Sequence, residues 1–268
     1  MTLPQTETLL LREDGPFLHI TLNRPDARNA MSLNMVNELL TVLESIVDNS
    51  TIRAIVLRGA GGHFCAGGDI KDMAGARMKA ASGDQDAFFQ LNRRFGTLIS
   101  QANHQPQVVV AVIEGAVLGG GFGLACIADI AIAAEDAQFG LPETGLGVIP
   151  AQIAPFVVQR IGLTQARRLA LTGARFNGAE AARLGIVHTA VPAAALDEHL
   201  NATLKQIRRC APQANRITKH LILSVGQQPL EILLDQAAQD FAAAVASEEG
   251  AEGTMAFVQK RLPSWAQE

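Results

Sequence analysis

The spacing of apolar and polar residues along this 268-residue chain predicts strands and helices in alternation. Apolar residues at helical spacing predict helices over about 32–48 and 87–103, and Ser32 is suited to cap the first of them. Short apolar runs, several rich in β-branched residues and typical of strands, occupy 17–23, 52–60, 108–115 and 129–134. Strands alternating with helices indicate the α/β class.

The second half of the chain loses its strand pattern. Further helices are predicted around Pro155, where the proline would kink the helix, and near 164–171 and 178–184. From about residue 194 to the end the pattern is helical throughout. We therefore expect a core over 1–193 and a C-terminal helical region over 194–268.

Charge and composition narrow the class of protein. The formal net charge of −4 argues against a general affinity for nucleic acid or anionic membrane. No apolar run reaches the ~18–20 residues that span a bilayer, and the polar N-terminus does not resemble a signal peptide, so a cytoplasmic protein is expected. Cys65, Cys126 and Cys210 have no metal-binding spacing, and for Cys65 packing is favoured over nucleophilic chemistry.

The first chemical signal is a run of three glycines, Gly119 to Gly121, between an apolar strand and an apolar helix. A helix that starts directly after a strand presents unpaired N–H groups, which can hold negative charge. Taken alone, such glycines more often mark a tight turn, and neither a dinucleotide fingerprint nor a phosphate loop is present. Glu143 follows in an apolar setting that favours a raised pKa, so it is a candidate proton-transfer group.

A second glycine-rich segment supports a site. HFCAGGDIKDM (63–73) also follows a strand, and two such strand ends could aim one N–H each at a single oxygen. Two converging amides make an oxyanion hole, where losing one donor costs about 10²–10³ in rate. Residues 70–86, which are small and charged, predict a mobile connection beside the site or, equally well, a plain solvated loop.

Five segments of the chain carry recognisable motifs: NRPDARNAMS (23–32), FCAGGDIKDM (64–73), the segment 115–143, LTGARFNGAEAARLGIV (171–187) and AFVQKRLP (256–263). Together they resemble one family, the enoyl-CoA hydratase/isomerase (crotonase) superfamily. That resemblance implies a spiral of ββα turns, a C-terminal helical trimerisation region, and trimers or pairs of trimers. It also implies an acyl-CoA thioester substrate held by two amides, with no cofactor beyond the coenzyme A of the substrate and no metal.

The resemblance assigns roles position by position. The oxyanion donors would be the N–H groups of Gly68 and Gly120, and Glu143 would be the catalytic carboxylate. Lys260 would reach the CoA of a neighbouring subunit. Arg28 and Lys71 could meet CoA phosphates, although isolated surface bases are about as often merely solvated charges. The positions expected around CoA are Arg28, Ala66, Asp69, Ile70 and Lys71.

One departure from the family pattern bears on mechanism. Straight-chain hydratases of this family carry two glutamates, and here the first position is Gly123, so Glu143 is left alone. A single carboxylate can isomerise a double bond, or it can hydrate one if it deprotonates water and then protonates the α-carbon. We expect Gly123 to be substrate-binding and to make room for a branched substituent.

A finer resemblance lies in residues 142–178 together with the glycine segment. These look like the branch acting on glutaconyl-CoA derivatives, with isohexenylglutaconyl-CoA hydratases favoured over methylglutaconyl-CoA hydratases. The predicted activity is therefore hydration of a branched glutaconyl-type enoyl-CoA. An enoyl-CoA delta-isomerase is the alternative in the same fold, and a non-catalytic scaffold or RNA-binding relative is a remote one.

Overall fold

The main sheet forms the centre of the molecule. The computed structural model describes residues 3–267, and six strands lie in the order β1-β2-β3-β4-β6-β9. β1 runs antiparallel to β2, whereas all the other neighbours are parallel. The strands are β1 (Leu9–Asp14), β2 (Phe17–Leu22), β3 (Ala54–Gly59), β4 (Val108–Ile113), β6 (Ile130–Ala134) and β9 (Thr189–Val191). β4 is apolar at every position because parallel strands are buried on both faces.

A second sheet of three short strands, β5 (Ala116–Leu118), β7 (Gln138–Gly140) and β8 (Arg175–Asn177), lies beside the glycine turn. Phe139 stacks on Phe176 with ring centroids 5.8 Å apart, and Phe122 meets Phe139 edge-on at 6.1 Å. These aromatic contacts tie the small sheet to the helix that follows the glycines. The glycine turn is therefore held by the small sheet before it and by α4 after it.

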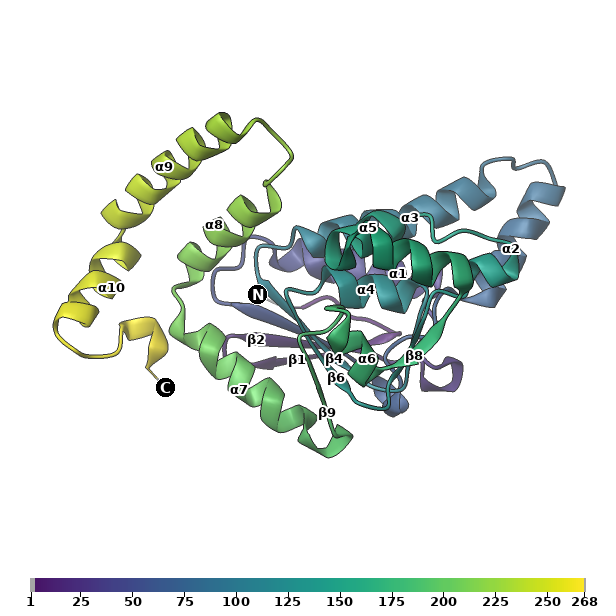
Figure 1. Cartoon of the computed structure of the whole chain (residues 1–268), viewed down its shortest axis with the longest axis horizontal. Coiled ribbons are helices and arrows are strands. Elements are labelled where there is room, and N and C mark those ends of the chain that lie inside the picture. The colour runs from purple at the N-terminus through teal and green to yellow at the C-terminus, as the bar shows by residue number, and fades with distance from the viewer. Residues whose placement is uncertain (1–2, 268) are drawn as a thin grey trace.

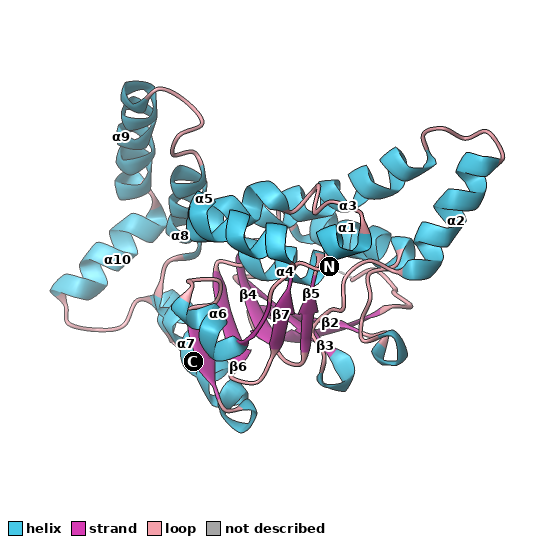
Figure 2. Cartoon of the chain, turned by 45° about the vertical axis from the view of Figure 1, so that its right-hand side comes forward, coloured by secondary structure: helices cyan, strands magenta, loops and turns pink. Residues whose placement is uncertain are grey.

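Several helices cover one side of the strands. Figure 2 shows α1, α3, α4 and α5 above the strands, with α7 on the opposite side. Their bounds are α1 (Leu33–Ile46), α2 (Ile70–Ala81), α3 (Ala87–Asn103), α4 (Gly120–Ile127), α5 (Ala154–Thr172), α6 (Gly178–Arg183) and α7 (Leu196–Arg209). Short 3₁₀ helices are η1 (Pro25–Ala27), η2 (Ala60–Gly62), η3 (Glu143–Leu146), η4 (Ala193–Ala195) and η5 (Ser264–Ala266).

The fold class expected from the sequence is confirmed: the chain is an α/β protein built around a mainly parallel sheet. The four predicted strands and the helices α1 and α3 are present, and Ser32 Oγ accepts the N–H of Met35 as the cap of α1. Five strands were not predicted. Four of these, β5, β7, β8 and β9, have only three residues each and are too short to show a periodic pattern.

Two local predictions were wrong. Residues 70–86 were expected to be a loop, but residues 70–81 form α2, whose first turn is capped by the Asp69 carboxylate. Pro155 does not kink its helix, because it lies in the first turn of α5, where a proline costs no hydrogen bond. The break in α5 is instead at Gly162, with φ of 73°.

The C-terminal region divides into two parts. α7 packs into the core through Leu196, Leu200, Leu204 and Ile207, although it follows the boundary predicted at 193. α8 (Pro212–Leu223), α9 (Leu230–Ala246) and α10 (Glu248–Val258) instead reach away from the sheet, on the side opposite α2 (Figure 1). We call α8–α10 the arm. Its exposed large apolar side chains include Ile222, Leu230, Ile232, Leu234, Phe241, Val245, Phe257 and Val258.

The arm is joined to the core by an ion pair. Lys219 Nζ of α8 lies 2.6 Å from Asp129 Oδ2, and the same carboxylate oxygen accepts the N–H of Val109 at the start of β4. Within residues 3–267, no helix is long and apolar enough to cross a membrane.

Candidate active site

The two glycine segments lie side by side because backbone hydrogen bonds join them. The N–H of Cys65 donates to Ala116 O at 2.9 Å, and the N–H of Leu118 donates to Cys65 O at 3.0 Å. His63 Nδ1 accepts the N–H of Ala116, so this histidine has a structural role. The convergence of the two strand ends that the sequence suggested is therefore present.

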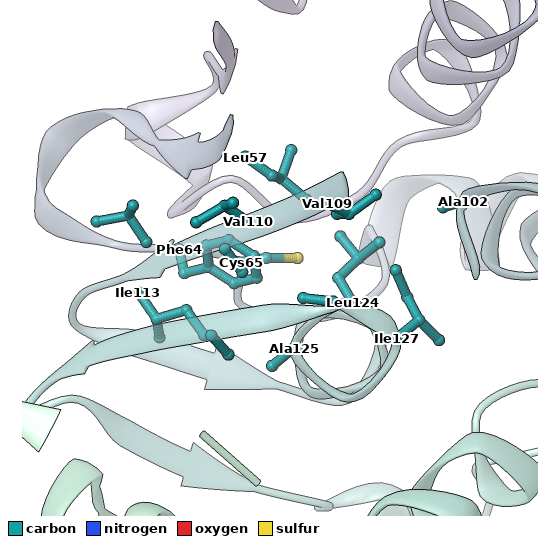
Figure 3. Close-up of a cluster of buried hydrophobic side chains, with 14 of the residues drawn as sticks. Leu57, Phe64, Cys65, Ala102, Val109, Val110, Ile113, Leu124, Ala125 and Ile127 are labelled. Carbon is teal, nitrogen blue, oxygen red and sulfur yellow. The ribbon is translucent and has the colours of Figure 1, made fainter. Parts of the chain in front are cut away.

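Close approach explains the glycines. A Cβ at Gly121 would lie 2.5 Å from Cys65 O, so any larger residue would separate the two segments. Cys65 itself is buried in the apolar cluster of Figure 3, and burial raises the pKa of its thiol to about 11. A thiol held protonated and out of solvent is a poor nucleophile, in agreement with the packing role expected for Cys65.

The other edge of the first glycine segment pairs with residues 28–31. The N–H of Met31 donates to Gly67 O at 2.7 Å, and the N–H of Asp69 donates to Met31 O at 3.1 Å. Within residues 64–69, these bonds leave the N–H groups of Gly67 and Gly68 without a protein acceptor among the described residues. The segment thus holds Gly68 rigidly while its donor remains available.

Another free donor is at the start of α4. Gly119, with φ of 51°, turns the chain out of β5, and α4 begins at Gly120. The N–H of Gly120 has no acceptor within residues 3–267, as expected for the first residue of a helix. A Cβ at Gly119 would be 3.7 Å from Gly67 Cα, so the backbones that carry the N–H groups of Gly68 and Gly120 adjoin each other.

Glu143 lies against these glycines. Its Oε1 is 2.9 Å from the position a Cβ would take at Gly119, and its Oε2 is buried without a hydrogen-bond partner. The N–H of Val148 donates to the backbone oxygen of Glu143, which fixes the 3₁₀ turn η3 at which the side chain starts. An orphaned carboxylate oxygen beside two unpaired N–H groups is an arrangement suited to moving a proton near a developing oxyanion.

Burial raises the pKa of Glu143, in the direction predicted from its sequence neighbours. Of the apolar neighbours behind that prediction, Leu141 is buried, whereas Leu146 and Ile149 are 75% and 72% exposed in the chain. The carboxylate also lies against Gly119, where its Oε1 is 2.9 Å from the position a Cβ would take.

Gly123 does not provide the room expected of it. A Cβ at Gly123 would lie 2.3 Å from Ile153 Cγ2 and 3.5 Å from Ile99 Cδ1. Ile153 therefore fills the space into which a longer residue 123 would extend. The sequence could not indicate this, because Ile153 reaches α4 only through the tertiary fold.

Phe95 is a second residue that the sequence did not single out. Its ring lies 3.0–3.6 Å from the position a Cβ would take at Gly120. Phe95 from α3 and Ile153, just before α5, thus flank the beginning of α4 with apolar surface. We call these two residues the α3 side of the site, and residues 66–71 the α2 side.

On the α2 side, Asp69 is engaged within the protein. Its carboxylate lies 2.6 Å from Arg24 Nη2 and accepts the N–H of Lys71 at 2.7 Å. Burial disfavours the charged form, but these hydrogen bonds outweigh it and hold the pKa of Asp69 below its usual value. Asp69 therefore positions the segment, and Arg24 is the partner that sequence reasoning missed, although it lies in the quoted motif NRPDARNAMS.

The remaining expected CoA contacts are more open. Arg28 is exposed and adopts a left-handed conformation with φ of 49°; Ile70 is 83% exposed at the start of α2, next to the exposed Lys71. Ala66, partly buried, is fixed by donating its N–H to Arg28 O at 3.0 Å. Their role toward CoA stays a prediction.

Lys260 is not brought near the other candidates within one chain. It lies two residues after the end of α10, the last helix of the arm, and its role toward a neighbouring subunit's CoA stays a prediction. No group of three or more His, Cys, Asp or Glu side chains suited to a metal occurs in the part of the chain that the structure describes.

Comparison with known proteins agrees with this geometry. The family model for enoyl-CoA hydratase/isomerase matches residues 13–268. The chain belongs to this family. The probable enoyl-CoA hydratase echA8 of Mycobacterium tuberculosis is 34% identical, with 97% of this chain and 98% of that protein aligned. The 2,3-dehydroadipyl-CoA hydratase of Escherichia coli is 31% identical over 96% and 98% of the two chains.

Solved structures include a nearer relative. The chain is 64% identical to Pseudomonas aeruginosa AtuE, with a TM-score of 0.94 and coverage of 97% of this chain and 100% of that one. A protein of this family with free amides at Gly68 and Gly120 and a half-buried glutamate has the features of an enoyl-CoA hydratase-like enzyme.

Proposed function

We propose that this protein hydrates a branched glutaconyl-type enoyl-CoA thioester, with isohexenylglutaconyl-CoA as the preferred candidate. The observation that carries the proposal is the position of Glu143, whose unpartnered carboxylate oxygen lies beside the unpaired donors of Gly68 and Gly120. Ile153 fills the space next to Gly123, so Glu143 is the one carboxylate assigned to the chemistry.

The reaction uses these groups in two steps. Glu143, ionised, takes a proton from water while the water oxygen bonds to the β-carbon, and the π electrons move toward the thioester oxygen. The N–H groups of Gly68 and Gly120 stabilise the enolate oxygen, assisted by the N-terminal dipole of α4. Glu143 then returns the proton to the α-carbon. One water is added and no other group is consumed.

The substrate class rests on two supports. Residues 142–178 resemble the branch of the family acting on glutaconyl-CoA derivatives. The E. coli relative is named for 2,3-dehydroadipyl-CoA, an ester whose acyl part is also dicarboxylic. Methylglutaconyl-CoA is the smaller member of the same substrate class.

A panel of three CoA esters tests the proposal. Crotonyl-CoA, 3-methylglutaconyl-CoA and isohexenylglutaconyl-CoA are each incubated with the protein, and loss of conjugated enoyl absorbance is followed together with the mass gain of one water. We expect the branched dicarboxylic esters to react with the higher kcat/KM. If crotonyl-CoA is hydrated fastest, the substrate class is wrong.

Isomerisation of the double bond is the second candidate, favoured by the same single carboxylate. One group that removes a proton and returns it at another carbon suffices for that reaction. An unconjugated ester separates the two activities, because isomerisation creates enoyl absorbance without a change in mass.

We also propose that the arm associates with other copies of the chain, as a trimer or a pair of trimers. Its support is the row of exposed apolar side chains, among them Phe241 at 71% and Phe257 at 84% exposure. Light scattering on the purified chain, and on the variant Phe257→Asp, measures the mass. A monomeric wild-type protein would contradict the assembly without affecting the assignment of Glu143.

A further inference from the structure

A polar cluster adjoins the α3 side of the site. Gly96 lies in the interior of α3, where glycine weakens a helix, so its presence needs a reason. A Cβ there would lie 1.9 Å from Gln152 Oε1 and 2.6 Å from Arg93 Nη1. The glycine therefore lets Arg93 and Gln152 fold together over the helix.

The guanidinium of Arg93 is held but not neutralised. Its Nη1 is 3.5 Å from Gln152 Oε1, and Gln152 Nε2 donates to Asn92 Oδ1 at 2.7 Å, which orients the amide oxygen toward Arg93. No carboxylate of residues 3–267 lies within ion-pair distance of Arg93. Its neighbour Arg94 likewise has no carboxylate of residues 3–267 within ion-pair distance, and it donates at 2.7 Å to Asn37 Oδ1.

Two segments connect this polar cluster to the site. Gly96 follows Phe95, whose ring lies over Gly120, and Gln152 precedes Ile153, which packs on Gly123. Arg28 and Lys71, two basic residues expected near CoA, belong instead to the segments beside Gly68. An anion at Arg93 would thus be attached to the acyl part of a substrate rather than to its CoA phosphates.

We propose that Arg93, oriented by Gln152 and Asn92, binds the free carboxylate of a dicarboxylic acyl-CoA thioester. A guanidinium presents several N–H donors in a planar fork that matches both oxygens of a carboxylate. This proposal rests on the proposed function in that it takes CoA thioesters as the ligands. It goes further by naming the group that distinguishes dicarboxylic from monocarboxylic substrates.

Two saturated esters test the proposal without turnover. Glutaryl-CoA and pentanoyl-CoA have the same chain length and differ in the terminal carboxylate, and calorimetry on the full-length protein measures both dissociation constants. We expect Arg93→Gln to weaken glutaryl-CoA binding about fivefold, since an ion pair at an exposed guanidinium is lost. Binding of pentanoyl-CoA is expected to change less than about twofold, on the scale of a surface substitution.

Arg94→Gln is the matched control, because it removes the same charge from the next residue of α3. We expect it to leave the dissociation constants of both esters unchanged. If Arg93→Gln weakens both esters alike, weakens neither, or is matched by Arg94→Gln, the carboxylate site is refuted.

The hydration assay separates this proposal from the proposed function. If glutaryl-CoA binding depends on Arg93 but no conjugated ester is hydrated, the carboxylate site stands and the hydratase assignment fails. If esters are hydrated and Arg93→Gln leaves the preference for dicarboxylic esters unchanged, the hydratase stands and the role of Arg93 is refuted.

Discussion

The two sides of the active site differ in how their polar groups are used. On the α2 side, the Asp69 carboxylate is bound by Arg24 and by the N–H of Lys71, and the backbone is paired with residues 28–31. On the α3 side, Phe95 and Ile153 present apolar surface, and the nearby guanidinium of Arg93 has no carboxylate partner.

This difference indicates that the α2 side holds the backbone of the site in place and that the α3 side is suited to select among substrates. A side whose polar groups are already paired holds the oxyanion donor of Gly68 in place, and substitutions there should affect every substrate. A side of apolar surface and an unneutralised cation should discriminate among acyl groups. Glu143 lies between the two sides, so its loss should outweigh any change on either.

The largest effect is expected for Glu143→Gln. Removing the only assigned proton-transfer group should lower kcat by about 10³, within the range known for general acid–base catalysis. Binding of CoA esters should be retained, which calorimetry with a saturated ester measures. Glu135→Gln is the control, because it makes the same chemical change at an exposed carboxylate. Retention of turnover by Glu143→Gln would refute the mechanism.

The next-largest effect concerns the N–H of Gly120. Two variants distinguish the loss of this donor from the crowding that a new Cβ would cause. Gly120→Pro removes the donor at the first position of α4, where a proline ring is compatible with a helix. Gly120→Ala keeps the donor but brings a Cβ within 3.0 Å of the Phe95 ring. We expect the proline variant to lose about 10²–10³ in kcat relative to the alanine variant. Equal activities in folded variants would exclude this amide as an oxyanion donor.

The third prediction concerns the packing of Ile153 on Gly123. Gly123→Glu should destabilise the protein by about 1–3 kcal/mol, because the new side chain collides with Ile153. In an Ile153→Ala background the same substitution should cost less, and denaturant unfolding of the four proteins gives the coupling energy. Additive effects would mean that Ile153 does not fill the space beside residue 123.

A smaller effect is expected from Asp69→Asn on the α2 side. Asparagine can still cap α2, so the change removes mainly the ion pair with Arg24. We expect a loss of about 1–2 kcal/mol in unfolding free energy, which thermal unfolding measures. We also expect kcat/KM to fall by the same factor for every ester of the panel, which the hydration assay measures. A loss confined to dicarboxylic esters would reverse the roles assigned to the two sides.

The sequence was informative about features of the site that depend on neighbouring residues, and uninformative about contacts between segments that are distant in the chain. The two glycine segments and Glu143 were singled out because glycine segments after strands, and a carboxylate in an apolar stretch, are visible in short windows. Within those segments, the family resemblance assigned Gly68 and Gly120. The contact of Phe95 with Gly120, and that of Ile153 with Gly123, join residues far apart in the chain. No periodicity records such contacts, so the prediction that Gly123 leaves room was wrong.

Among the elements, the same distinction holds. Long amphipathic helices such as α3 were predicted with their observed bounds, because one apolar face repeats over several turns. The helix α2 was not predicted because it has a single buried residue, Ala76, and hence almost no apolar face. Its helical state depends on the Asp69 cap and on its packing beside α3, which the sequence pattern does not reveal.

The smallest predicted effect is a pH shift at Glu143, which lies between the two sides. The free carboxylate acts as base, and burial raises its pKa above the ordinary 4.5. The acid limb of kcat/KM should therefore lie above pH 4.5. The folded protein favours the protonated form of Glu143. The contribution of this group to the free energy of unfolding is therefore most favourable below pH 4.5 and is lost as the pH rises through the raised pKa. Glu143→Gln should accordingly gain melting temperature relative to wild type between acid and neutral pH.

Substituting an exposed neighbour identifies the cause of this pKa shift. Ile149 is 72% exposed, so Ile149→Ser should leave the acid limb where it is if the glycine segments desolvate Glu143. A fall of the acid limb toward pH 4.5 in that variant would assign the desolvation to the apolar residues after Glu143 instead. The carboxylate would then be shielded by its own loop, and the contact between the two glycine segments would no longer account for its basicity.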